Sequence, residues 1–399
     1  MRIFVTGIGI FTSIGKNSTE TLHSIETGHS GIGYAQYLKT NLKDILPVAE
    51  IKHSNEELAL MAGVENVQHF TRTALLAIFA ARQSVQDAGL SVEELSKTGL
   101  VSATSVGGMD KSENFYPEFI SNPDKGRLRN IVHHDCGDST EAIARELGLK
   151  QFLTTISTAC SSSANSIMLG ARLIKNGYVD RVLAGGADSL TRFTMNGFNS
   201  LMILDKNHCK PFDENRNGLN LGEGAAYLVL ESEESAIKNN RKIYCELRGY
   251  GNACDAFHQT ASSPDGYGAW LAMKKALDTA HLSPEEISYI NVHGTGTQNN
   301  DLSEGKAVEK LFGDAIPPLS STKAFTGHTL GAAGAVEAVL ASLAITNGLI
   351  YPNLNFSEKM KELNFLPNIK LIKNATVNHV LSNSFGFGGN NSTLIFSRS

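Results

Sequence analysis

The stretch "FLTTISTACSSSANSIMLGARLIKNG" (152–177) joins an apolar, β-branched run to a helical pattern through a short turn of small residues. The run predicts a strand, and the helical pattern ends at Gly177, a typical residue just past a helix. Cys160 lies in the turn near the helix N-terminus, where unpaired backbone N–H groups and the helix dipole favour a thiolate. This segment alone leaves two interpretations of Cys160: a packed thiol, as most free cysteines are, or a nucleophile.

Apolar strands alternate with helical patterns along the rest of the chain, which predicts an α/β fold whose sheets are covered on both faces. The order of elements restarts near residue 240, so we expect two similar halves, 1–240 and 241–399. No linker separates the halves, which favours one compact unit. Strands are predicted at 2–10, 99–106, 152–158, 181–189, 224–232, 242–252, 287–294 and 392–399, and helices within 71–90, 162–177, 268–282 and 331–348.

The chain has 399 residues and a formal net charge of -5, which is not the basic signature of a nucleic-acid-binding protein. It has five cysteines and no C-x-x-C pair, which argues against a disulfide framework or a zinc site and favours a reducing compartment. The N-terminus has no signal-peptide pattern, and no stretch approaches the roughly 20 apolar residues that span a bilayer. We therefore expect a cytoplasmic protein without a membrane or nucleic-acid partner.

Three polar residues stand at predicted strand ends or helix starts. His293 ends an apolar strand, and Lys323 and His328 precede a Gly/Ala-rich helix that can approach the helix after Cys160 closely. The carboxyl ends of strands are where α/β folds bind their ligands. A Gly-rich stretch, "SNSFGFGGNNSTLIF" (382–396), is either a turn with a bulge or a loop whose N–H groups stabilise an oxyanion. Each feature alone has a structural interpretation, but together they favour nucleophilic catalysis.

Five segments resemble the signature blocks of the β-ketoacyl-[acyl carrier protein] synthases, the condensing enzymes I and II and their type II polyketide and polyene relatives. The segments are "TACSSSANSI" (158–167), "KPFDENRNGLNLGEGAAYLVLE" (210–231), "VHGTGTQNND" (292–301), "STKAFTGHTLGAAGAVEAV" (321–339) and "NSFGFGGNN" (383–391). They occur in the family's order and cover essentially the whole chain. The resemblance implies a thiolase-like, five-layered α-β-α-β-α sandwich of two pseudo-duplicated halves. Residues 1–240 would hold the nucleophile and the dimer interface, and 241–399 the other catalytic groups and the gating loop.

The resemblance also implies a role for each matching residue. Cys160 is expected to be the nucleophile, His293 and His328 the paired imidazoles, and Lys323 their neighbour, with Asp301 and Glu304 supporting Lys323. Backbone N–H groups of Cys160 and of the gating residue Phe387 would form the oxyanion hole. The expected substrate-binding residues are Thr260, Thr295, Thr297 and Val106, and the expected structural monovalent-cation site comprises Asn291, Glu337, Ser382 and Asn383.

The implied reaction is a decarboxylative Claisen condensation of malonyl-[acyl carrier protein] with an acyl chain held on Cys160. No cofactor is required, because phosphopantetheine arrives on the acyl carrier protein. The expected assembly is a homodimer, or a heterodimer with a chain-length-factor-like subunit. The alternative function is a non-catalytic subunit of that kind, but such subunits lack the active cysteine that this chain retains. The chain departs from the family at Asn390, where many members have Thr, and in keeping only Arg72 where members have several basic residues before a docking helix.

Overall fold

The computed structural model describes residues 1–399, and its ten strands hydrogen-bond in the order β3-β2-β4-β5-β1-β6-β10-β9-β7-β8. The strands form two sets, β1–β5 and β6–β10. From its outer edge inwards the first set runs β3-β2-β4-β5-β1 and the second runs β8-β7-β9-β10-β6, so equivalent strands occupy equivalent places. Each pair of neighbouring strands has the same parallel or antiparallel sense in both sets. The two sets meet where Phe4 and Val5 pair with Glu246 and Cys245. The strands are β1 (Ile3–Thr12), β2 (Gly99–Ala103), β3 (Leu153–Ile156), β4 (Arg181–Asp188), β5 (Gly224–Ser232), β6 (Cys245–Cys254), β7 (Tyr289–Asn291), β8 (Leu319–Ser320), β9 (His379–Gly386) and β10 (Asn390–Ser397).

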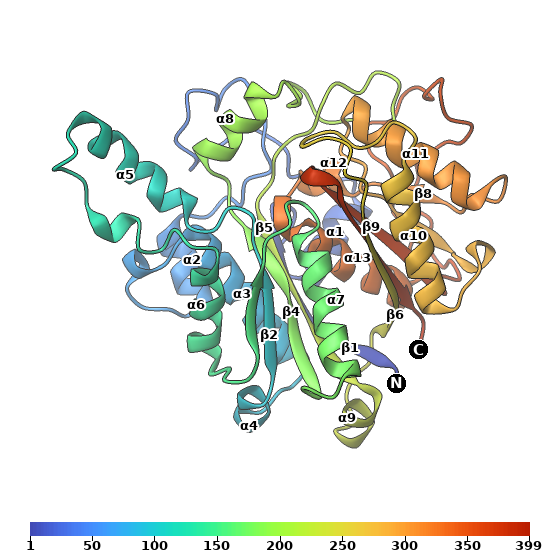
Figure 1. The fold of residues 1–399 in the computed structure, drawn as a ribbon, viewed down its shortest axis with the longest axis horizontal. Helices are drawn as coiled ribbons and strands as arrows, with labels where there is room; N and C mark the ends of the chain where they lie inside the picture. Colours follow the sequence, from blue (N-terminus) through green and yellow to red (C-terminus); the bar gives the residue numbers. More distant parts are fainter.

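The helices divide among three layers around these strands (Figure 1). The central layer is α7 (Ser162–Lys175) and α13 (Ala333–Asn347), which share a core of 39 buried residues with strands from both sets. One outer layer is α2 (Asn55–Ala62), α3 (Arg72–Asp87) and α6 (Gly137–Leu147), and the other is α10 (Tyr267–Ala280) and α11 (Gln298–Phe312), each over a core of its own. The predicted α-β-α-β-α sandwich is therefore confirmed.

Shorter elements decorate the edges of the sandwich. Figure 1 shows α5 extending away from the body of the molecule and α8 lying above the sheet. The helices are α1 (Ser18–Glu26), α4 (Val92–Ser96), α5 (Met109–Ser121), α8 (Arg192–Ser200), α9 (Glu233–Lys238) and α12 (Lys323–Thr326), and the 3₁₀ turns are η1 (Val67–His69), η2 (Leu128–Asn130), η3 (Pro284–Glu286), η4 (Leu330–Ala332) and η5 (Phe387–Gly389).

Helices α7 and α13 approach each other through residues with little or no side chain. A Cβ atom added at Gly334 would lie 2.8 Å from the backbone nitrogen of Ala164 and 2.9 Å from its Cβ. The backbone N–H of Ala335 donates to Oγ of Ser163 at 2.9 Å, so a hydrogen bond joins the first turns of the two helices. The prediction that the Gly/Ala-rich helix contacts the helix after Cys160 is confirmed.

The stretch Leu330–Asn347, which comprises η4 and α13, is long and hydrophobic enough to cross a membrane by length and composition alone. The expectation that no stretch comes near that length was therefore too strict. In the structure 89% of this stretch is buried inside the protein, where it contacts strands of both sets. A helix that is apolar on all sides suits the centre of a five-layered fold.

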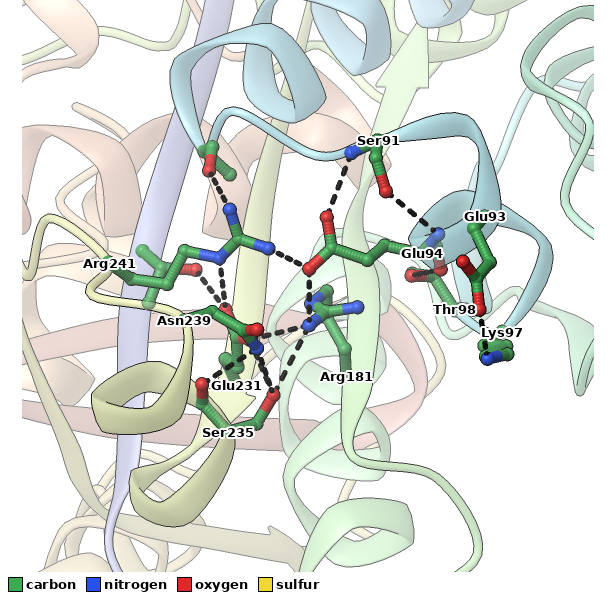
Figure 2. Close-up of polar contacts among 12 residues, drawn as sticks. Ser91, Glu93, Glu94, Lys97, Thr98, Arg181, Glu231, Ser235, Asn239 and Arg241 are labelled. Atoms are coloured by element: carbon green, nitrogen blue, oxygen red, sulfur yellow. Dashed lines mark hydrogen bonds and ion pairs between the residues drawn. The ribbon is translucent and has the colours of Figure 1, made fainter.

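A buried ionic cluster ties the link between the halves to the first half (Figure 2). Arg241, just past the expected boundary, pairs with Glu94 and donates to the carbonyl oxygens of Ala88 and Gly89 at 3.1 and 3.0 Å. Arg181 on β4 donates to Glu231 on β5 at 2.6 Å and to Glu94 at 3.4 Å. The boundary we expected at 240/241 thus lies in a segment that charged hydrogen bonds fix in place, as one compact unit requires.

Replacing Gly334 by Ala tests the contact between α7 and α13. Because the added methyl group meets Ala164 below van der Waals distance, we expect a loss of about 1–3 kcal/mol in the free energy of unfolding. The matched control is Gly197→Ala in α8, where the new Cβ has no atom within 4 Å and helix propensity gains up to about 1 kcal/mol. Urea unfolding measures both, and equal stability of the two variants would contradict the close approach.

Candidate active site

The turn before α7 holds Cys160 in a constrained backbone. Ala159 has a φ of +53°, which a residue with a side chain rarely adopts and which costs on the order of 1–3 kcal/mol. Oγ of Ser162 accepts the backbone N–H of Thr158 at 2.8 Å and donates to the carbonyl oxygen of Ala159. The serines after Cys160 therefore hold the turn together and join it to the neighbouring helix α13.

Cys160 is buried at the base of a cavity of about 320 Å³. Its Sγ lies 3.1 Å from Nε2 of His328, and the backbone N–H groups of Phe387 and of Cys160 itself are directed at the sulfur. Burial raises the pKa of Cys160 to about 12, although the charge of Lys323 and the N–H of Phe387 act in the opposite direction. The N–H group of Cys160 at the helix start lowers the pKa of the thiol as expected, but desolvation outweighs this effect and the resting group is a thiol.

The two histidines face the thiol as neutral rings. Their ring centroids are 5.3 Å apart at an interplanar angle of 86°, and Sγ and one nitrogen of each ring lie within 4.8 Å of one another. Burial, and then the charge of Lys323, lowers the pKa of both histidines well below its usual value. Nδ1 of His328 accepts the backbone N–H of Leu330 at 3.1 Å, so the proton of the neutral ring is on Nε2 and points to the sulfur.

Lys323 is buried and its ammonium group pairs with Glu337 on α13. The expectation that Asp301 and Glu304 support Lys323 is wrong. Glu304 accepts the backbone N–H groups of His293 and Gly294, both at 2.8 Å, and Asp301 accepts those of Gly296 and Phe212 at 3.2 and 2.8 Å. These carboxylates lie on α11 beneath the loop after β7, and they position the His293 loop rather than Lys323.

The expected substrate-binding residues separate into two groups. Thr260, Thr295 and Thr297 line the cavity, and the hydroxyl groups of the last two lie 2.9 Å apart. Val106 does not line this cavity: it packs with Leu190, Met195 and other apolar residues behind it. The aromatic ring of Phe387 stacks on Phe198 of α8, with centroids 5.7 Å apart, so the gating residue has an apolar neighbour that the sequence did not indicate.

Asp188, at the carboxyl end of β4, is a second residue that sequence reasoning missed. Its buried carboxylate accepts the backbone N–H groups of Ser105 and Val106, at 3.0 Å each, and of Gly331 at 2.6 Å. It thereby joins the loop after β2 to the segment that carries His328. A polar residue ending the run "RVLAGGADS" was the signal that could have found it.

The residues expected to hold a monovalent cation do not all share one face. Asn291 lies opposite Ser382 in the register of β7 and β9, and Glu337 lies beside Ser384, the next residue on that face of β9. Oδ1 of Asn291 and Oε2 of Glu337 are buried oxygens without a hydrogen-bond partner, which fits a cation ligand set. The side chain of Asn383 points to the other face, where it contacts Glu304 and Thr393, so its amide is not part of this set.

Arg72, the single basic residue that remained in the expected docking segment, is a structural residue. Its guanidinium donates to both oxygens of Glu223, at 2.9 and 2.6 Å, and to the carbonyl oxygens of Ile51 and His53. Lys111 and Arg129 instead reach the surface of that segment, where each contacts Gln68. Positive charge is therefore present next to η1, supplied from α5 and η2.

A five-layered sandwich with a cysteine, two neutral histidines and a lysine at its centre defines an enzyme of the thiolase-like acyl-transfer class. The model of the beta-ketoacyl synthase N-terminal domain matches residues 1–236, and that of the C-terminal domain matches residues 244–357. The chain therefore belongs to the β-ketoacyl synthase family and is a condensing enzyme.

Relatives and solved structures agree with this assignment. A 3-oxoacyl-[acyl-carrier-protein] synthase 2 of Staphylococcus aureus is 33% identical over 416 residues, which span 100% of this chain and 98% of the relative. The ishigamide ketosynthase/chain length factor is 33% identical with a TM-score of 0.93 and covers 100% of this chain and 99% of its own. A type II polyketide ketosynthase, solved in complex with its acyl-carrier protein, is 25% identical with a TM-score of 0.89 and the same coverage.

The lowered pKa of the two histidines predicts the pH dependence of malonyl-thioester decarboxylation. A histidine of ordinary pKa, about 6.5, would be roughly three-quarters protonated at pH 6. Because both rings here have pKa values well below that, they stay neutral, and the decarboxylation rate should remain within about twofold between pH 8 and pH 6. A pH–rate profile checks this, and an acid limb near pH 6.5 would contradict the assigned protonation states.

Proposed function

We propose that the chain catalyses the decarboxylative condensation of a malonyl thioester with an acyl group held on Cys160. The observation that supports this most directly is the approach of Sγ of Cys160 to Nε2 of His328, at 3.1 Å, beside a second neutral histidine at the base of the cavity. The non-catalytic, chain-length-factor-like alternative is not favoured, because Cys160, His293, His328 and Lys323 are all present and buried.

In the first step Cys160 attacks the carbonyl carbon of an acyl thioester. The tetrahedral oxyanion accepts hydrogen bonds from the backbone N–H groups of Cys160 and Phe387, and oxyanion donors of this kind contribute about 10²–10³-fold each. The bond between the carbonyl carbon and the sulfur of the carrier arm then breaks. The arm leaves as a thiolate, and it takes up a proton in place of the one that Cys160 lost. The charge of Lys323 lowers the pKa of Cys160 and so favours the thiolate that attacks.

In the second step the malonyl thioester loses CO₂, and negative charge develops on its carbonyl oxygen. Nε2–H of His328 and a ring N–H of His293 donate to that oxygen, and neutral rings can do so repeatedly because neither is consumed. The resulting carbanion attacks acyl-Cys160, a carbon–carbon bond forms, and Cys160 leaves as a thiolate. None of these steps needs a metal or redox cofactor.

We propose an acyl carrier protein as the donor of both substrates, with its phosphopantetheine arm between Thr295, Thr297 and Thr260 at the cavity mouth. Carrier proteins of this type are acidic, and Lys111 and Arg129 beside Gln68 provide positive charge for docking. We propose that the reaction takes place in the cytoplasm, where the five free cysteines of the chain stay reduced.

We propose that the first half also forms a dimer interface at the free edge of β3. Leu153 in that strand and Phe152 before it are exposed, so apolar surface lies at the edge of an unpaired strand. The partner is a second copy of the chain or a chain-length-factor-like subunit. Mass photometry of the chain expressed alone decides between them, since a monomer would exclude the homodimer.

We also propose that a monovalent cation binds Asn291, Ser382 and Glu337. Its charge would stabilise the buried carboxylate oxygen that Lys323 does not contact. Potassium chloride should then raise the melting temperature more than choline chloride at equal ionic strength. Identical melting curves in the two salts would exclude the site.

Acyl loading tests the nucleophile. Incubation with octanoyl-N-acetylcysteamine should add one octanoyl group to the intact mass, and Cys160→Ala should abolish the adduct. Cys245→Ala is the matched control, because Cys245 is equally buried and its pKa is also about 12, but it lies away from the cavity. His328→Ala should remove malonyl decarboxylation. An adduct that survives Cys160→Ala, or decarboxylation that survives His328→Ala, would refute the corresponding role.

A further inference from the structure

The loop that carries Phe387 is anchored at both ends on the turn that carries Cys160. At its start, a Cβ atom on Gly386 would lie 2.9 Å from the carbonyl oxygen of Thr158, so only glycine lets the backbones approach this closely. At its end, the side chain of Asn390 reaches back to the same turn. Between these anchors Gly388 and Gly389 have positive φ values of 80° and 76°, which glycine adopts readily.

The amide oxygen of Asn390 is a shared acceptor for three segments. It lies 2.8 Å from Oγ of Ser161, next to the nucleophile, 2.9 Å from Nδ2 of Asn165 on α7, and 2.9 Å from Nδ2 of Asn252 on β6. These contacts join both halves of the fold at one atom. Because two of the three neighbours are amide donors, the position requires an acceptor oxygen.

A second ring of hydrogen bonds holds those donors in place. Oδ1 of Asn165 accepts Oγ of Ser392 at 2.7 Å and Nδ2 of Asn252 at 3.1 Å, and Nδ2 of Asn165 also donates to Oγ1 of Thr158 at 2.9 Å. These hydrogen bonds determine the orientation of the Asn165 amide. They thereby also determine the direction from which Nδ2 of Asn165 donates to Asn390. A side chain at position 390 that lacks the acceptor would remove the one atom that these three donors share, and each donor would keep only its contacts within its own neighbourhood.

We propose that Asn390 is a positioning residue that sets the backbone N–H of Phe387 against the sulfur of Cys160. Only the attack on the acyl thioester, and the return of the carbanion to acyl-Cys160, develop an oxyanion at that N–H. Malonyl decarboxylation develops its charge at the histidines, which contact neither Asn390 nor its partners. Asn390 therefore acts on acyl transfer and not on decarboxylation. The inference rests on the roles proposed above for Cys160 and the histidines.

The test compares the two half-reactions in Asn390→Leu and Asn390→Asp. Leu matches the size of Asn but removes the acceptor, and Asp keeps an oxygen toward all three neighbours. For Asn390→Leu we expect octanoyl transfer from octanoyl-N-acetylcysteamine to fall at least 10-fold, while decarboxylation of malonyl-N-acetylcysteamine stays within threefold. Asn390→Asp should recover most of the transfer rate. Asn347→Leu, at an exposed asparagine near the end of α13, is the control and should change neither.

Each other outcome overturns the inference. Unchanged acyl transfer in Asn390→Leu would show that the contacts do not position the loop. A parallel loss of both half-reactions, or a loss that Asn390→Asp does not restore, would show a general structural defect. If the unsubstituted protein accepts no octanoyl group, the proposed function itself fails, which is distinguishable from a failure at Asn390 alone.

Discussion

The contact between the first turns of α7 and α13 is the constraint on which the catalytic centre depends. Cys160 and His328 each precede one of these helices, so the distance between helices determines the distance between sulfur and imidazole. Gly334 and Ala164 allow that distance, and Ser163 fixes it with a hydrogen bond. The same packing removes water, which explains why the thiol keeps its proton and the histidines remain uncharged. The centre therefore works through directed N–H groups rather than through a set of permanent ions.

An ion pair also lies in this dry interior, close to the catalytic groups. Lys323 is paired with Glu337, and breaking such a buried pair by removing one partner costs about 3–5 kcal/mol, whereas an exposed pair contributes about 0–1 kcal/mol. Burial, and then the charge of Lys323, lowers the pKa of His293 and His328. Burial and the lysine together keep both rings in the one protonation state that can donate to an enolate.

The layers and most strands were predictable because their apolar and glycine patterns are local. The strand β9 was not, since "HVLSNSFG" is rich in small polar residues and becomes a strand only through its neighbours β7 and β10. Within the site, the nucleophile, both histidines and the lysine follow from motifs. The partner of Lys323, the protonated state of Cys160 and the place of Val106 depend on burial and on contacts between distant segments, which a sequence pattern does not record.

The repeated strand order places the catalytic groups on two loops that occupy equivalent positions. Cys160 follows β3, and Lys323 follows β8, the strand that holds the same place in the second half. Two loops in equivalent places therefore carry different groups, one a nucleophile and the other a cation and hydrogen-bond donors. Neither half contains a complete set of groups. This division of labour requires both halves to belong to one polypeptide, because a symmetric pair of identical chains would carry the same residues in both loops.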